Sequence, residues 1–392
     1  MPEAVILSAC RTAIGKFGKS LVGIPAPRLG AIAIGESVKR AKVQSKQVEE
    51  VIMGNVVSAG LGQNPARQSA IFAGIPVSVG AFTVNKVCGS GLKGVMLAAQ
   101  SIRAGDNNLV VAGGMENMSN APYLVRNLRW GVRYGDTKMV DSMINDGLWD
   151  VYNDYHMGIT GEVIAKRYRI TRRDADEFAY ESHMRASRAI REGRFDEEIV
   201  PVGVEGEKGA REHFKKDECV REDTTLEKLR RLKPVFKDGG ILTAGNSSQL
   251  SDGASALVVA SEEKAEELGR RPLAKIIGYA TGGTKPELVM EAPIPTTKAL
   301  LSKVGMGIEE MDLVEHNEAY ATASIAVREA LGVDPKKFNV NGGAVSLGHP
   351  IGCSGARVLT TLIYALKHTG KKRGLATLCL GGGNAVSMIV ER

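Results

Sequence analysis

Two glycine-rich segments lie far apart in the chain and are followed by the same order of structural signals. The segment 88–91 (Cys-Gly-Ser-Gly) precedes a stretch with helical periodicity and the apolar run 109–112, which ends in two glycines. The segment 352–355 (Gly-Cys-Ser-Gly) precedes another helical stretch and the apolar run 376–380, which ends in three glycines. Self-similarity at this scale indicates a duplicated structural unit. It predicts two similar halves that face each other.

Short apolar runs alternate with helical patterns in the first third of the chain, and the alternation returns in the last third. The periodicity predicts strands at 5–8, 51–53, 109–112 and 376–380, and helices at 29–39, 91–102 and 356–367. Strands joined through helices lie parallel in one sheet and are covered by helices. The sequence therefore predicts an α/β fold with βαβ-rich halves and a mainly parallel sheet.

The middle of the chain differs from both ends. Charged residues become frequent, and the sequence predicts one helix, from about Thr171 to Arg191, among long loops. Irregular segments of this length often build binding sites. We therefore predict three parts, listed by residue: a first core half formed by 1–118 plus 249–269, an inserted loop domain at 119–248, and a second core half at 270–392.

Charge and cysteine content argue against several classes of protein. The net charge is +7, but aromatic residues make up only 5%, which argues against a stacking surface for nucleic acid. Five cysteines without a CxxC pair fit neither a disulfide framework nor a zinc site. No apolar stretch approaches the roughly 20 residues of a membrane span, and no signal peptide is apparent. We expect a cytoplasmic protein with reduced thiols that binds neither nucleic acid nor a membrane.

Cys88 and His349 are the first candidates for chemistry. Cys88 lies where a strand is expected to turn into a helix, and the N–H groups and dipole of a helix N-terminus favour a thiolate. His349 precedes Pro350, outside any helix, in the matching turn of the second half. A histidine there could serve as the base that a nucleophilic cysteine needs. The alternatives are a buried core cysteine and an ordinary loop histidine.

Two further residues become candidates only when they are considered together with Cys88 and His349. Cys379 ends an apolar strand in front of three glycines, where a cysteine alone would be interpreted as a core residue. Asn317 follows the short strand 313–314 at a helix start, where an asparagine alone would be interpreted as a cap.

Together, four motifs resemble the thiolase family over essentially the whole chain. They are VCGSG around Cys88, NEAY at Asn317, GHPIGCSG at His349 and CLGGG at Cys379. Within that family, the chain is most similar to the acetoacetyl-CoA thiolases. The resemblance implies a thiolase-like fold, with two similar halves packed as layered sheets and helices and an inserted loop domain. It also implies an acyltransferase that joins two acetyl-CoA into acetoacetyl-CoA plus CoA and catalyses the reverse thiolysis.

The same resemblance assigns roles to the motif residues. Cys88 would be acylated after His349 takes its proton, and Cys379 would remove a proton from the α-carbon of a second acetyl-CoA. His349, with a water held by Asn317, would stabilise the enolate oxygen. The backbone N–H groups of Cys88 and Gly381 would stabilise the tetrahedral intermediate. Coenzyme A would be a substrate and product, and no cofactor or metal is implied.

The inserted loop domain would bind CoA. The positions that match the family's CoA contacts are Leu148, His156, Met157, Arg221, Leu232, Phe236, Ala244, Ser248, Ala319 and Tyr320. The segment 126–130 resembles the loop that thiolases use for tetramer contacts, so the resemblance implies a homotetramer or a homodimer. Four places depart from the family's pattern: Asn384, the acidic stretch 217–223, the segment 246–249 and Cys353.

His156 and Met157 resemble the acetoacetyl-type form of their loop, and we expect them to shorten the acyl pocket. The alternative within the family is a degradative 3-ketoacyl-CoA thiolase of broader chain length. A ketoacyl synthase is a third interpretation, but Cys379 argues against it. A non-catalytic CoA or lipid carrier, or a scaffold within a larger complex, is the alternative of another class, and the complete set of Cys88, His349 and Cys379 argues against it.

Overall fold

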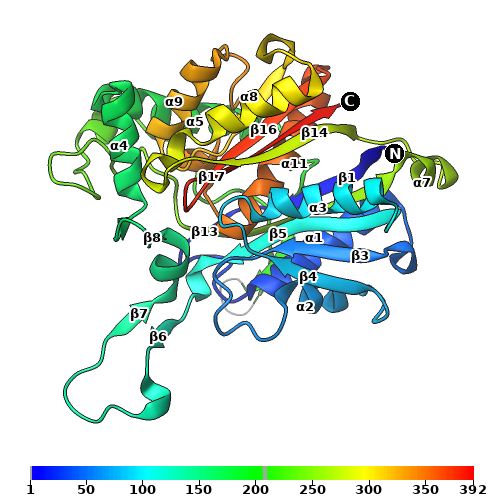
Figure 1. The fold of residues 1–392 in the computed structure, drawn as a ribbon, viewed down its shortest axis with the longest axis horizontal. Helices are drawn as coiled ribbons and strands as arrows, with labels where there is room; N and C mark the ends of the chain where they lie inside the picture. The colour runs from blue at the N-terminus through cyan, green and yellow to red at the C-terminus, as the bar shows by residue number, and fades with distance from the viewer. Residues whose placement is uncertain (1, 206–209) are drawn as a thin grey trace.

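The computed structural model describes residues 2–205 and 210–392. Each half of the molecule contains one mixed sheet, and two buried helices lie between the two sheets (Figure 1). The strand order is β4-β3-β5-β13-β1 in the first half and β14-β17-β16-β15 in the second. Strands β1 and β14 pair over two residues, which joins the halves into one eleven-stranded sheet with the short strands β2 and β10.

The sheet strands are β1 (Ala4–Thr12), β2 (Gly15–Lys16), β3 (Glu50–Gly54), β4 (Gly80–Val84), β5 (Leu109–Asn117), β10 (Ile199–Val200), β13 (Ser251–Ser261), β14 (Ala274–Gly283), β15 (Leu313–His316), β16 (Arg373–Leu380) and β17 (Asn384–Glu391). The α-helices are α1 (Ala26–Ala41), α2 (Pro65–Phe72), α3 (Ser90–Ala104), α4 (Gly158–Tyr168), α5 (Arg172–Arg191), α6 (Leu226–Arg230), α7 (Glu262–Glu267), α8 (Pro293–Val304), α9 (Ala321–Leu331), α10 (Ala344–Leu347) and α11 (Ile351–Thr369). The predicted strands and helices of the first and last thirds are all present, and each extends beyond its predicted bounds.

The expectation of a mainly parallel sheet is wrong. Strand β3 runs parallel to β4 and β5, and β15 runs parallel to β16. The remaining long pairs are antiparallel: β1 with β13, β13 with β5, β14 with β17, and β16 with β17. The physical reason is clearest at β16 and β17, because three glycines join them and a turn so short permits only antiparallel pairing.

Helices α3 and α11 form the central layer of the molecule. Their apolar faces share one core with strands of both halves, whereas α1 and α2 cover the outside of the first sheet and α8 and α9 cover the outside of the second. The two central helices meet at matching glycines. A Cβ on Gly91 would lie 2.7 Å from the Ala356 nitrogen, and a Cβ on Gly355 would lie 2.4 Å from the Leu92 nitrogen. This contact confirms the duplicated unit, because the two glycines occupy the same place in the two repeats.

The middle segment contains more structure than the long loops that the sequence predicts. Helix α5 is present, and Thr171 and Asp174 form its capping box. The sequence interpretation missed helix α4, the π-helical turn Met143–Leu148 and three small hairpins. The hairpins consist of β6 (Tyr123–Val125) with β7 (Met139–Asp141), β8 (Trp149–Asp150) with β9 (Tyr155–His156), and β11 (Val202–Glu205) with β12 (Arg211–Phe214). The π-helical turn and the strands of these hairpins carry too few periods of hydrophobic pattern to be recognised. The three-part domain division stays a prediction.

The β6–β7 hairpin projects away from the body of the molecule (Figure 1). Apolar side chains are exposed along it, namely Tyr123, Leu128, Trp130, Val132, Tyr134 and Met139. Within the described ranges, no helix is both long enough and apolar enough to cross a membrane.

Candidate active site

Cys88 lies on a tight turn between strand β4 and helix α3. The preceding residue, Val87, has a φ of +46°, which a β-branched side chain rarely adopts. Such strain costs about 1–3 kcal/mol and persists only where the surroundings enforce it. Here Ser90 enforces it: its hydroxyl accepts a hydrogen bond from the Lys86 nitrogen at 2.8 Å and donates one to the Val87 carbonyl at 2.6 Å. The turn therefore holds the Cys88 thiol beside the helix N-terminus.

The expected thiolate at Cys88 is not what the resting site favours. Burial raises the pKa of Cys88 to about 12, against the lowering effect of hydrogen bonds from the N–H groups of Gly381 and of Cys88 itself. The sequence argument counted the helix N-terminus but could not count the loss of water around the sulfur. Because the thiol keeps its proton at rest, the site needs a base next to it.

His349 has the form of such a base. Its Nδ1 lies 2.5 Å from the Ser354 hydroxyl, which donates its own proton to the Pro350 carbonyl at 2.9 Å. The hydroxyl oxygen must therefore accept from Nδ1–H, which leaves the lone pair on Nε2. Burial, together with the positive charge of Arg357, lowers the pKa of His349 to about 3, so the imidazole is neutral. The Nε2 atom faces Asn317, whose Nδ2 is 3.3 Å away.

Cys379 is the next-to-last residue of strand β16 and is buried. Burial, and next the proximity of Cys88, raises the pKa of its thiol far above the usual value. Its sulfur lies 3.6 Å from the Met290 sulfur. At rest this thiol also keeps its proton, so Cys379 can give a proton before it can take one.

These side chains meet in one small space, which we call the inner cavity. It has a volume of about 40 Å³, and Cys88, His349, Cys379 and Gly381 all line it. Asn317 reaches this group through His349, and its Oδ1 is buried without a hydrogen-bond partner among the residues that the structure describes. Residues from the starts of α3 and α11 and from the end of β16 thus converge on one point. The duplicated halves explain the convergence, because they bring two helix N-termini together.

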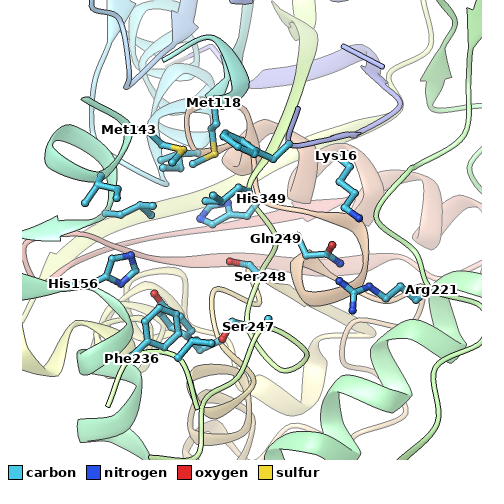
Figure 2. A pocket seen from close by; sticks show the side chains of 18 residues that line it. Lys16, Met118, Met143, His156, Arg221, Phe236, Ser247, Ser248, Gln249 and His349 are labelled. Atoms are coloured by element: carbon cyan, nitrogen blue, oxygen red, sulfur yellow. The ribbon is translucent and has the colours of Figure 1, made fainter. Parts of the chain in front are cut away.

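A larger space of about 370 Å³, the outer cavity, opens beside the inner one. The two cavities share Leu148, Ser248, Tyr320 and His349. Figure 2 shows His349 in the middle of the outer cavity, His156 on one side, and Lys16 and Arg221 together on the other. The outer cavity therefore leads from a pair of cationic side chains to the thiols.

Most of the predicted CoA contacts lie on these two cavities. The outer cavity is lined by Leu148, His156, Arg221, Phe236, Ala244, Ser248 and Tyr320, and the inner one also by Met157 and Ala319. The His156 ring stacks on Phe236 with centroids 4.9 Å apart, and Phe236 meets Tyr320 edge-on at 5.7 Å. Leu232 is the exception: it lines neither cavity and packs with Leu229 and Val345 instead.

Of the departures from the family's pattern, the stretch 217–223 reaches the outer cavity through Arg221, whereas Asp217 and Asn384 line neither cavity. Asp217 is buried and accepts two hydrogen bonds from the Arg11 guanidinium, at 2.7 and 2.9 Å, so it stabilises the fold. Asn384 begins β17, and its Oδ1 lies 3.3 Å from the Lys86 amine.

Several lining residues were missed by the sequence interpretation. They are Lys16, Phe17, Met118, Met143, Gln249, Ile351 and, in the inner cavity, Val289 and Met290. Apart from Ile351, which belongs to the GHPIGCSG motif, they carry no motif that the sequence analysis used. They come from loops and helix ends that only the tertiary fold brings to the site.

Comparison with known proteins gives a consistent result. The thiolase N-terminal domain profile matches residues 4–263, and the thiolase C-terminal domain profile matches residues 270–392. The chain is 55% identical to an acetyl-CoA acetyltransferase of Cupriavidus necator and 50% identical to one of Escherichia coli, in each case over the whole of both chains. It also superposes on the crystal structure of the Bacillus anthracis acetyl-CoA acetyltransferase with a TM-score of 0.97 at 42% identity, covering 100% of this chain and 99% of the other.

Proposed function

This chain belongs to the thiolase family, and from that premise we propose that it condenses two acetyl-CoA molecules into acetoacetyl-CoA and CoA and catalyses the reverse thiolysis. The observation that carries the proposal is the inner cavity, where two thiols and a neutral imidazole line one space. The outer cavity has Lys16 and Arg221 on one side and His349 in its middle, an arrangement that suits CoA, whose phosphates are joined to the thioester by the pantetheine arm.

In the first half-reaction, His349 Nε2 takes the Cys88 proton and the sulfur attacks the thioester carbonyl of acetyl-CoA. The oxyanion of the tetrahedral intermediate accepts hydrogen bonds from the N–H groups of Cys88 and Gly381, which also stabilise the thiolate. The departing CoA sulfur takes the Cys379 proton. This leaves acetyl-Cys88, a protonated His349 and a Cys379 thiolate, and the protons balance.

In the second half-reaction, the Cys379 thiolate removes a proton from the α-carbon of a second acetyl-CoA. Protonated His349 now carries Nε2–H and can donate to the enolate oxygen, assisted by a water on the unpartnered Asn317 Oδ1. The enolate carbon attacks the acetyl-Cys88 carbonyl, and the bond to sulfur breaks. His349 returns its proton to Cys88, acetoacetyl-CoA leaves, and the site regains its resting state. No cofactor or metal takes part in these steps.

We propose acetoacetyl-CoA as the preferred thiolysis substrate because the inner cavity is small. On the same measure of volume a water needs roughly 10–15 Å³, so about 40 Å³ admits only a short acyl group. Met157, Val289, Met290 and Leu380 close its walls. Each methylene that stays outside forfeits roughly 0.8 kcal/mol of burial.

The test follows the loss of acetoacetyl-CoA absorbance when free CoA is added. We expect turnover that depends on CoA, with kcat/KM falling for 3-ketohexanoyl-CoA and again for 3-ketooctanoyl-CoA. Absence of turnover by folded protein would support a carrier or scaffold. Equal or better thiolysis of 3-ketooctanoyl-CoA would instead favour a degradative thiolase of broader chain length.

We further propose a homotetramer assembled through the β6–β7 hairpin, in a cytoplasmic enzyme. The support is the exposed apolar surface of the hairpin, where Trp130 is 79% and Tyr134 100% exposed. Isolated exposed aromatic side chains are common, but a projecting group of them marks an interaction surface. The variant Trp130→Glu/Tyr134→Glu should lower the mass measured by light scattering to that of a dimer. An unchanged mass would contradict this use of the hairpin. The low cysteine content, with no CxxC pair, supports the cytoplasmic location.

A further inference from the structure

Glu116 is a fully buried carboxylate that the proposed mechanism does not use. It lies near the end of β5, and no lysine, arginine or histidine of the described residues comes within salt-bridge distance of it. A buried carboxylate without a cation is costly unless hydrogen bonds satisfy it. Hydrogen-bond donors must therefore stabilise the Glu116 carboxylate.

Four N–H donors from two distant parts of the chain converge on this carboxylate. Its Oε1 accepts from the Asn55 amide at 2.6 Å and from the Val57 nitrogen at 3.2 Å. Its Oε2 accepts from the Val56 nitrogen at 3.0 Å and from the Gly352 nitrogen at 2.9 Å. Burial raises the pKa of Glu116 to about 7, and the hydrogen bonds from the Gly352, Val56 and Val57 nitrogens act against this rise. All four partners are donors, so they favour the ionised carboxylate, which is the main form at pH 8.

One of these contacts leads to the His349 turn. Gly352 is the second residue of helix α11, where backbone N–H groups have no partner within the helix. It lies three residues after His349, so Glu116 caps the helix whose start carries the base. There is no room for a side chain at this position, because a Cβ on Gly352 would lie 2.7 Å from the Met115 carbonyl oxygen and 2.9 Å from the Glu116 carboxylate.

The other contacts lead to the Cys88 turn. The Asn55 nitrogen donates to the Val84 carbonyl at 3.1 Å, and Val84 is the last residue of β4 before the turn. Val56 and Val57 belong to the apolar cluster against which Val87 and Cys88 pack. The Glu116 carboxylate thus binds both the segment 55–57, which contacts the Cys88 turn, and the first turn of α11, which follows His349.

We propose that Glu116 is a positioning residue of the reaction: it fixes the separation between the Cys88 turn and the His349 turn. Its negative charge acts in the same place. Burial is the main cause of the raised pKa of Cys88, and the ionised Glu116 raises it further, so the charge helps to keep the thiol protonated until His349 takes the proton. The remaining groups that face this thiol are His349, Cys379, Tyr320 and the N–H groups of Gly381 and Cys88.

Two variants separate the effect of the length of the Glu116 side chain from the effect of its negative charge. Glu116→Gln keeps the shape but loses the charge and turns an NH₂ group toward the donors, whereas Glu116→Asp keeps the charge but is one methylene shorter. Because a shift of about 1 Å between catalytic groups can cost about a hundredfold, we expect both variants to lower kcat for acetoacetyl-CoA thiolysis at least about tenfold. Since Glu116 lines neither cavity, KM for CoA should change less than about twofold.

The second readout needs no turnover. Iodoacetamide should label Cys88 about threefold faster at pH 8 in Glu116→Gln, because the nearby charge is gone, and at the wild-type rate in Glu116→Asp. A purely structural defect would not make labelling faster in Glu116→Gln while leaving it unchanged in Glu116→Asp. Unchanged kcat in folded Glu116→Gln would overturn the positioning role, and unchanged labelling would overturn the role of the charge.

If Glu116→Gln does not fold, Asn55→Ala replaces it. This variant keeps the carboxylate and removes one donor, so kcat should fall about threefold, and an unchanged kcat would overturn the inference. The inference rests on the proposed function, but the two fail separately. Inactive wild-type protein would contradict the proposed function, whereas an active wild type with fully active variants would contradict only the role of Glu116.

Discussion

The turn before α3 and the turn before α11 occupy matching places in the two halves but present different groups. Each contains a serine at the same aligned position, Ser90 or Ser354, and each serine donates to a carbonyl four or fewer residues earlier in its own turn. The serines differ in what they accept. Ser90 accepts from the Lys86 backbone nitrogen, whereas Ser354 accepts from the His349 imidazole.

This difference shows how a duplicated scaffold supplies two unlike catalytic groups. In the first half the serine stabilises a strained backbone that presents a thiol, with Val87 at a φ of +46°. In the second half the same hydroxyl selects the tautomer of a base. The glycine contacts between α3 and α11 then hold the two turns together. The predictions below test whether the two turns have separate roles.

The largest effect is expected from the nucleophile. Cys88→Ser should lower thiolysis by roughly 10⁴-fold or more, because a serine hydroxyl is a far weaker nucleophile beside the same base. The matched control is Cys353→Ser in the second turn, where the cysteine is buried and lines neither cavity. The control should stay within about threefold of wild type. If the control lost as much activity as Cys88→Ser, the two turns would not differ as described.

The next effect is expected from the base. His349→Asn removes the group that takes the Cys88 proton, and general-base catalysis contributes about 10²–10⁴-fold, so kcat should fall by roughly a thousandfold. His368→Asn, on the far end of α11, is the control and should leave kcat unchanged. Full activity of His349→Asn would show that another group takes the proton.

A third prediction concerns the protonation of the thiols. Cys88 is the one partly exposed cysteine among the described residues, since Cys10, Cys219, Cys353 and Cys379 are buried. Iodoacetamide should therefore label Cys88 first, and acetyl-CoA should protect it. Because the pKa of Cys88 is raised to about 12, its thiolate fraction should rise about tenfold per pH unit. The labelling rate should thus increase roughly a hundredfold from pH 7 to pH 9. A labelling rate that levels off near pH 7 would contradict the raised pKa and would show that Cys88 is a thiolate at neutral pH, as the sequence suggests.

The smallest effect separates the two serines. Ser354→Ala removes the acceptor that fixes the His349 tautomer, so kcat should fall roughly tenfold and the pH profile of kcat/KM should shift. Ser90→Ala removes two partly buried hydrogen bonds from the strained turn, so it should mainly lower the free energy of unfolding, by about 1–3 kcal/mol. Thermal unfolding and pH–rate profiles distinguish them. Interchanged phenotypes would contradict the assigned roles.

The sequence predicts the parts of this protein that depend on local pattern. The repeat, the helices that begin after residues 88 and 350, and the candidates Cys88, His349, Cys379 and Asn317 all follow from short motifs. It fails where burial or distant packing decides. The pKa of Cys88 depends on the removal of water around the thiol on folding. The Leu232 side chain packs into a local apolar cluster instead of lining a cavity. Glu116 and Met290 come close to the catalytic residues only in the folded chain.

The central claim is that Cys88 carries the acyl group while Cys379 moves the proton of the second substrate. Mass spectrometry of Cys379→Ser after mixing with acetyl-CoA tests it most directly. In this variant the serine hydroxyl or a water can still protonate the departing CoA sulfur. The serine cannot act as the base that removes a proton from the α-carbon of the second acetyl-CoA. We predict a stable acetyl group that peptide mapping assigns to Cys88, with no acetoacetyl-CoA formed. A folded Cys379→Ser protein that acquires no acetyl group, or that carries it on a residue other than Cys88, would contradict the account.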